Sequence, residues 1–222
     1  MDFSLNLAIN DLLCKNKDPA RNYVGASSIG NHCERKIWYQ YQGVSYDAPP
    51  QLKITFEIGK RLESMIIDFL VSAGLEIIRP TIGDALFCFD KDLPSFSGHM
   101  DALIVMPNGN EAVLEIKTAK ASSFAKLVHE TKGGLKNWNS QYYAQMQAYM
   151  GMTGTDDAVL FVINKDSSET YEEWIKFNPI FYDELKCKAA RIIDSESEPE
   201  RINKNPIFYL CQMCGYKEKC HG

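Results

Sequence analysis

The fold is decided by two neighbouring segments, Ser97-Gly98-His99-Met100-Asp101 and Ala112-Val113-Leu114-Glu115-Ile116-Lys117. Side chains alternate along a strand, so Glu115 and Lys117 share one face of the second segment. Leu114 and Ile116 point to the opposite face, which is apolar and belongs to a core. A carboxylate and an ammonium group therefore lie side by side, and neither is tolerated unpaired if it is buried.

Asp101 reaches this pair only in one of the registers open to the hairpin. A two-residue turn at Asn108-Gly109 puts Asp101 on the wrong face, whereas a three-residue loop over 108–110 pairs it with Lys117. We expect the three-residue loop, because such loops with Gly or Asn in the left-handed conformation are common. Two carboxylates then share a site with one lysine, which favours a hard divalent cation, Mg²⁺ or Mn²⁺. The alternative is a plain cross-strand ion pair at a sheet edge.

Glu63 is a candidate third carboxylate. It lies in a segment from Thr55 to Ala73 whose apolar residues repeat at helical spacing. The residues three, four and seven positions after Glu63 are apolar, and Gly59 permits close approach one turn before it. The alternative is a solvent-exposed helix glutamate next to Lys60 and Arg61.

A cation held by acids beside a lysine suits phosphodiester hydrolysis. The cation polarises the scissile phosphate and lowers the pKa of a bound water. The lysine orients that water or neutralises charge that develops on the phosphate. The chain has no Gly-x-x-x-x-Gly-Lys-Ser/Thr loop, which excludes a nucleotide-driven motor of that type.

The hydrophobic pattern predicts helices and strands that alternate along the chain. One predicted helix is capped by Ser27-Ser28 and carries residues 33–41. The other predicted helices cover 3–15, 55–73, 121–130, 138–152 and 179–194. The predicted strands cover 75–79, 85–89, 96–106, 111–118, 158–164 and 170–177. This order indicates an α/β fold with a central sheet flanked by helices.

The cysteines fall into two groups. Cys14, Cys88 and Cys187 stand alone among apolar neighbours and are expected to be small buried hydrophobes. The other four are Cys33, far upstream, and Cys211, Cys214 and Cys220 in the tail. The two-residue gap between Cys211 and Cys214 lets two thiolates face one metal.

These motifs resemble the PD-(D/E)XK nuclease superfamily. Asp101 matches its first acid and Glu115-Ile116-Lys117 its E-x-K, although Met100 stands where the family often has Pro. Gly59 to Glu63 resembles the Gly-x-x-x-Glu of lambda-type alkaline exonucleases. CRISPR-associated RecB-like exonucleases differ here, because they usually carry His at the position of this Glu. Residues 143–149 (YAQMQAY) resemble both the lambda-type Ala-Gln-x-Gln and the RecB-like Gln-x-x-x-Tyr.

The four cysteines are similar to the one-plus-three pattern of iron–sulfur nucleases of the AddB and CRISPR-associated RecB-like type. In those nucleases four thiolates hold a [4Fe–4S] cluster that clasps the two ends of the domain. The resemblance implies one nuclease domain over 1–222, with a restriction-endonuclease-like mixed sheet in a core of about 55–194. The clasp is expected to join 27–41 to 205–222.

The resemblance also implies roles for individual residues in a metal-dependent DNA exonuclease. The expected ligands of Mg²⁺ or Mn²⁺ are Asp101, Glu115, the carbonyl of Ile116 and Glu63, and the expected ligands of the cluster are Cys33, Cys211, Cys214 and Cys220. Lys117 is expected to position the attacking water. Gln145 and Tyr149 contact the substrate or order the site, and Arg35 meets a phosphate. The process is expected to be recombination, repair or CRISPR-type DNA processing.

The composition agrees with a DNA nuclease and restricts where the chain can contact DNA. The chain has 222 residues, 45% of them hydrophobic, and lacks both a secretory signal and a membrane-spanning run, so we expect a cytoplasmic protein. Its net charge of −5 means that contact with DNA strands or DNA ends needs local basic clusters. A recombination, helicase or CRISPR-adaptation protein is the expected partner. The alternatives are a non-catalytic DNA-end-binding module and a zinc-stapled structural protein, in which His32 and His221 compete as ligands.

Overall fold

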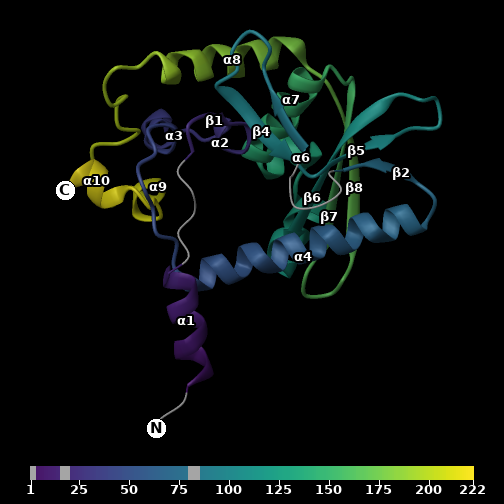
Figure 1. Cartoon of the computed structure of the whole chain (residues 1–222), viewed down its shortest axis with the longest axis horizontal. Coiled ribbons are helices and arrows are strands. Elements are labelled where there is room, and N and C mark those ends of the chain that lie inside the picture. The colour runs from purple at the N-terminus through teal and green to yellow at the C-terminus, as the bar shows by residue number, and fades with distance from the viewer. Residues whose placement is uncertain (1–3, 16–20, 80–85) are drawn as a thin grey trace.

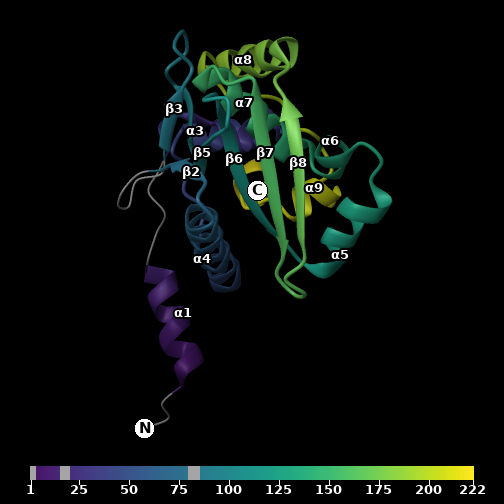
Figure 2. The same ribbon diagram turned by 90° about the vertical axis from the view of Figure 1, so that its right-hand side faces the viewer.

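The computed structural model describes residues 4–15, 21–79 and 86–222. Its strands form two sheets (Figures 1 and 2). The three-stranded sheet has the order β1-β4-β3, with β1 at Val24–Gly25, β3 at Leu86–Phe89 and β4 at Phe96–Met100. The five-stranded sheet has the order β2-β5-β6-β7-β8, with β2 at Glu76–Ile78, β5 at Ala102–Val105, β6 at Glu111–Ala119, β7 at Asp157–Asn164 and β8 at Thr170–Lys176. The β6–β7 pair is parallel and its neighbours are antiparallel, so the sheet is mixed.

Helices surround both sheets. They are α1 (Leu5–Lys15), α2 (Ala26–Ile29), α3 (Glu34–Tyr41), α4 (Pro50–Ser72), α5 (Ala121–Ala125), the π-helical turn η1 (Lys126–Glu130), α6 (Gly134–Trp138), α7 (Ser140–Thr153), α8 (Pro179–Ile193), α9 (Tyr209–Gln212) and α10 (Lys217–His221). The expected mixed α/β fold with helices flanking a sheet is confirmed. In the described residues, no helix combines the length and apolar character that crossing a membrane requires.

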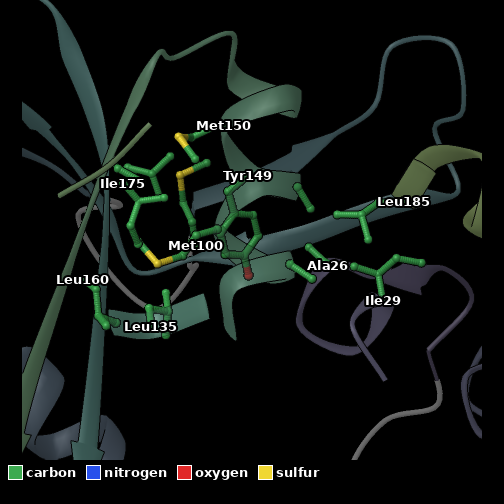
Figure 3. Close-up of a cluster of buried hydrophobic side chains, with 14 of the residues drawn as sticks. Ala26, Ile29, Met100, Leu135, Tyr149, Met150, Leu160, Ile175 and Leu185 are labelled. Carbon is green, nitrogen blue, oxygen red and sulfur yellow. The ribbon is translucent and has the colours of Figure 1, made fainter. Parts of the chain in front are cut away.

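Both faces of β6 are buried, each against a different helix. Leu114 and Ile116 face α4 and pack with its Ile66 and Ile67, as the alternation of the sequence predicts. Val113 faces the other way, into the core beneath α7, part of which Figure 3 shows around Tyr149 and Met150. A strand buried on both faces holds its polar side chains in fixed positions, because none can turn out to bulk water.

Local signals set where the helices begin. Asn139 caps α7, since its side-chain oxygen accepts from the N–H groups of Gln141 and Tyr142 at 3.1 Å each. Pro50 occupies the first turn of α4, where its missing N–H costs nothing. The predicted start of this helix at 55 was therefore five residues late, because the prediction rested on the apolar repeat and not on the prolines. Helix α4 ends before Gly74, as predicted.

The register of the β5–β6 hairpin differs from the prediction. Val105 pairs with Glu111 and Ala102 with Leu114, so continuing the register by one residue places Asp101 opposite Glu115. The turn begins at Met106, whose carbonyl accepts the N–H of Gly109 at 2.8 Å. Gly109 adopts a left-handed φ of 83°. The predicted and observed registers differ by an even number of residues, so Asp101 stays on the face of Glu115.

The N-terminal and C-terminal parts of the chain meet at one end of the molecule, where α3, α9 and α10 lie together (Figure 1). The Trp38 indole donates to the carbonyl of Ser195 at 3.0 Å. The rings of Tyr39 and Tyr216 lie 5.4 Å apart. The segments expected to form a clasp, 27–41 and 205–222, are therefore in contact.

The three isolated cysteines do not behave alike. Cys88 is buried, as expected, with 8% of its surface exposed. Cys14 and Cys187 are exposed, so the prediction of burial was wrong for both. Cys14 lies on α1, which extends away from the body (Figure 1) and has no buried residue.

Candidate active site

Three carboxylates and one lysine converge beside β6, on the face that packs against α7. Glu63 comes from α4, Asp101 from the bend that joins β4 to β5, and Glu115 and Lys117 from β6. The charge of Asp101 raises the pKa of both Glu63 and Glu115, so the three acids form one electrostatic cluster. The fold thus brings together the residues that the sequence placed in one site.

Glu115 is the centre of the cluster and is completely buried. Its Oε1 accepts hydrogen bonds from the Lys117 ammonium and from Nε2 of Gln145, the latter at 2.7 Å. Its Oε2 is also buried but has no hydrogen-bond partner among the described residues. A buried carboxylate oxygen without a partner is costly, and a cation would satisfy it.

Burial and like charge make the acids hard to ionise together. Burial, with the charge of Asp101, raises the pKa of Glu115 to about 8. The same two causes raise the pKa of Glu63 to about 7. Burial lowers the pKa of Lys117, but the neighbouring carboxylates raise it above its ordinary value. The ammonium is therefore charged at neutral pH and offsets only part of the repulsion among the acids.

Asp101 is held against β6 by the backbone. Its Oδ2 accepts the N–H of Ile116 at 2.8 Å, which fixes the carboxylate beside Glu115. Burial raises the pKa of Asp101, while Lys117 and the Ile116 N–H lower it by favouring the ionised form. The role of the Ile116 carbonyl as a ligand stays a prediction.

A buried hydrogen-bond chain supports the cluster from α7. Nε2 of Gln145 also contacts the Tyr149 hydroxyl at 3.2 Å, and that hydroxyl donates to the carbonyl of His99 at 2.6 Å. Gln145 is 5% exposed and Tyr149 1%. Gly98 lets the Tyr149 ring approach β4, because a Cβ there would lie 2.8 Å from the ring. Gln145 thus bonds Glu115 directly and Tyr149 bonds Gln145, while the two roles expected for these side chains stay predictions.

Tyr142 is a site residue that the sequence reasoning missed. The Lys117 ammonium lies 5.2 Å from the centre of its ring, a cation–π contact. Tyr142, Gln145 and Tyr149 follow one another at spacings of three and four residues, so they share one face of α7. This helical spacing is the feature of the sequence from which Tyr142 could have been predicted.

Arg35 is not brought to the carboxylates. Its guanidinium pairs with Glu198 at 3.1 Å and donates to the carbonyl of Pro199 at 2.6 Å. It also contacts the Cys220 sulfur at 3.8 Å. Arg35 therefore joins α3 to the C-terminal segment rather than lining the acid cluster.

The four motif cysteines gather at that same end of the molecule. Cys33 caps α3, Cys211 lies in α9, Cys214 follows it, and Cys220 lies in α10. Burial raises the pKa of the Cys211 thiol, and the other three cysteines are near enough to raise it further. All four are free thiols.

Neither cluster forms a closed metal shell by itself. In the parts of the chain that the structure describes, no group of three or more His, Cys, Asp or Glu side chains is arranged to hold a metal ion. Mg²⁺ needs no such cage, because it keeps several waters and takes one or two carboxylates together with substrate phosphates. The unpartnered Oε2 of Glu115 fits that open kind of site.

One segment of the chain matches the model of a known protein family. Residues 76–156 match the YqaJ-like viral recombinase domain. The matched segment contains Asp101, Glu115, Lys117, Gln145 and Tyr149, while Glu63 and the four motif cysteines lie outside it. No curated protein matches the chain.

Solved structures share the fold at low sequence identity. LHK-Exo in complex with dAMP has a TM-score of 0.58 at 14% identity, covering 78% of this chain and 87% of that one. A second structure of LHK-Exo, an alkaline exonuclease from Laribacter hongkongensis, matches with a TM-score of 0.57 and the same identity and coverage. SSO0001 has a TM-score of 0.54 at 17% identity and covers 97% of this chain and 93% of that one. The shared fold with SSO0001 thus extends over nearly all of the chain.

Proposed function

We propose that this chain is a divalent-metal-dependent DNA exonuclease of the PD-(D/E)XK type. The observation that carries the proposal is the cluster of Glu63, Asp101, Glu115 and Lys117, in which one oxygen of the buried Glu115 has no hydrogen-bond partner among the described residues. The match to the YqaJ-like viral recombinase domain and the fold shared with an alkaline exonuclease support the same activity.

The residues divide into ligands and positioning groups. Asp101 and Glu115, with the carbonyl of Ile116, would hold Mg²⁺ or Mn²⁺, and Glu63 would add charge from α4. When bound, the cation supplies polarisation of the scissile phosphate and activation of the attacking water. Lys117 orients that water and places a positive charge near the phosphate.

Gln145 and Tyr149 hold the Glu115 side chain in position while its second oxygen binds a cation. With its Nε2 bonded to Oε1 of Glu115, Gln145 leaves Oε2 as the oxygen free to bind a cation. Tyr149 ties Gln145 to the β4 carbonyl of His99, so the strand that leads to Asp101 and the strand that carries Glu115 are linked through α7.

We further propose that Cys33, Cys211, Cys214 and Cys220 hold a [4Fe–4S] cluster. The proximity of the other three thiols to Cys211 supports this assignment. Each iron of a cubane takes one thiolate, so its ligands stand farther apart than those around a single ion. Such a cluster would fasten α3 to the tail and restrain both ends of the domain.

The process that this activity would serve is DNA recombination. The family match, a viral recombinase domain, favours it over general repair or CRISPR-type processing. DNA strands or ends are the substrate, and a recombination or helicase partner protein would supply or receive the processed strand.

Digestion of labelled DNA tests the proposal. Protein purified without oxygen is mixed with oligonucleotides labelled at the 5′ or 3′ end, single-stranded or duplex, with Mg²⁺, Mn²⁺ or a chelator. Exonuclease activity predicts metal-dependent release of mononucleotides from one end. Binding without any cleavage would support a non-catalytic DNA-end-binding module instead, and internal cuts alone would indicate an endonuclease.

A further inference from the structure

A cluster of aromatic side chains, three of them exposed, lies on the outer face of the β3–β4 hairpin. We call it the aromatic platform, and its members are Tyr23, Phe87, Phe89 and His99. Phe87 and Phe89 are 53% and 49% exposed, although phenylalanine is ordinarily a core residue. Cys88 between them is buried, so this strand hides one face and displays the other.

The strand register puts these rings on one surface. Phe87 pairs with His99 across the hairpin, and their ring centres lie 5.0 Å apart. Phe89 lies 6.2 Å from Phe87 along β3. Tyr23 completes the cluster, with its ring centre 6.2 Å from both Phe87 and His99. Phe87 thus contacts each of the other three rings and is still 53% exposed.

The charges around the platform suit an anionic ligand. The Arg21 guanidinium lies 6.0 Å from the Tyr23 ring, at the edge of the cluster. Asp90 directly follows Phe89 but is buried and compensated, since it pairs with Lys186 at 3.0 Å and accepts from Tyr182 at 2.6 Å. Strand β3 itself, Leu86–Phe89, contains no acidic residue.

The platform is directly connected to the acid cluster. His99 lies two residues before Asp101, about 7 Å along a strand. Its carbonyl accepts from the Tyr149 hydroxyl, which joins it to Gln145 and so to Glu115. A ligand on the rings would thus lie next to the strand end that carries the first acid.

We propose that the aromatic platform stacks unpaired bases of the DNA strand whose phosphate enters the acid cluster. This inference rests on the proposed nuclease function and adds a substrate class to it, a single-stranded segment. Every base has a π-face that an aromatic ring can stack on without reading sequence, whereas the bases of an intact duplex are covered by their neighbours. Arg21 is placed to meet the accompanying backbone charge.

The test measures binding without catalysis. The full chain is titrated, in chelator, with a single-stranded oligonucleotide of about twelve nucleotides containing 2-aminopurine, a length within the usual range for stacking grooves. Wild-type protein should quench the 2-aminopurine fluorescence. The double variant Phe87→Ala/Phe89→Ala should lose the quenching and bind at least about tenfold more weakly, which corresponds to about 1.4 kcal/mol. The double variant Phe87→Tyr/Phe89→Tyr should retain both.

Trp174→Ala is the matched control. Trp174 is also an exposed aromatic residue, at 48%, but lies on β8, away from β3 (Figure 2). It should bind and quench like the wild type. Equal affinity and quenching in the Phe87→Ala/Phe89→Ala variant would overturn the inference, and so would an equal loss of affinity for blunt duplex. A shift from dimer to monomer in that variant, with DNA binding unchanged, would assign the face to a second copy of the chain.

The outcome is separable from that of the proposed function. If wild-type protein stacks bases in chelator but never cleaves DNA with metal, the nuclease proposal fails and the stacking site stands. If it cleaves DNA and the platform variants digest single strands with unchanged KM, the nuclease stands and the platform inference fails.

Discussion

Gln145 on α7 donates a 2.7 Å hydrogen bond from Nε2 to Oε1 of Glu115, although thirty positions separate the two residues. This contact, together with the Lys117 ammonium, occupies one oxygen of a fully buried carboxylate, while the other has no hydrogen-bond partner in the part of the chain that the structure describes. Glu115 is thus oriented before any ligand arrives, which is the arrangement expected of a preformed catalytic carboxylate.

Replacing Gln145 should separate orientation from stability. Gln145→Leu removes the donor to Glu115, and the buried partners it leaves should lower the free energy of unfolding by about 1–3 kcal/mol. Gln147→Leu is the matched control, because Gln147 is equally buried on α7 but bonds the Lys176 carbonyl and the Asn178 N–H. Urea unfolding should show similar losses for the two variants. Only Gln145→Leu should also weaken metal binding and cleavage, and equal activities would contradict the positioning role.

The stability of the metal-free protein should fall as the pH rises. The pKa values of Glu115 and Glu63, about 8 and about 7, lie above those of the unfolded chain, so ionisation of either acid disfavours the folded state. A bound cation stabilises the ionised acids and should reverse this trend. The rise in Tm on adding Mn²⁺ should therefore be larger at about pH 9 than at about pH 6. Glu115→Gln should flatten the difference, and a pH-independent rise would contradict the assignment of the ligands.

Glu63 should matter less than Asp101. Asp101 is fixed by the Ile116 N–H, whereas Glu63 reaches the cluster from the partly exposed face of α4. Glu63→Gln should therefore retain more cleavage than Asp101→Asn under the same metal. Glu57→Gln, an exposed acid on the same helix that pairs with Lys60 at 3.0 Å, provides the control and should be near normal. Equal losses for Glu63→Gln and Asp101→Asn would make Glu63 a direct ligand.

The cysteine cluster should be visible by colour. Protein purified without oxygen should be brown, with broad absorbance near ~400 nm and about four irons per chain. Cys33→Ala and Cys214→Ala should lose the colour and lower the Tm of the whole domain. Cys14→Ala and Cys187→Ala, at exposed positions that are not part of the motif, should keep both. A colourless active protein with one tightly bound zinc would replace the iron–sulfur assignment with a zinc staple.

The elements that the sequence predicted well are those with local signals. The apolar repeat of α4 and the left-handed Gly74 that follows it are written in neighbouring residues, and so is the alternation along β6. The hairpin register was missed because it depends on where the turn begins. The side chain of Asn108 accepts the Asn110 N–H at 3.0 Å, and this local bond favours a turn starting at Met106 over the predicted loop at 108–110.

The sequence predicted which acids and which lysine belong to the cluster, but it did not predict the long-range contacts around them. Arg35 was expected to meet a phosphate as a local basic residue, whereas the structure pairs it with Glu198 and Pro199, more than 160 positions away, where no local pattern points to them. The contact of Tyr142 with Lys117 could have been found from the helical spacing to Gln145. The platform could not, because only the pairing of β3 with β4 brings Phe87 to His99.

The most direct measurement compares two matched aspartate variants in the cleavage of end-labelled DNA. Asp101→Asn removes a charge from the acid cluster, whereas Asp183→Asn changes an exposed aspartate on α8. With saturating Mg²⁺ or Mn²⁺, single-turnover cleavage by Asp101→Asn should fall by about a hundredfold or more, because the loss of charge stabilisation costs several kcal/mol. Asp183→Asn should cleave at the wild-type rate, and both variants should stay folded. Near-normal cleavage by folded Asp101→Asn, or equal rates for the wild type with metal and with chelator, would contradict a metal-dependent nuclease centre at this cluster.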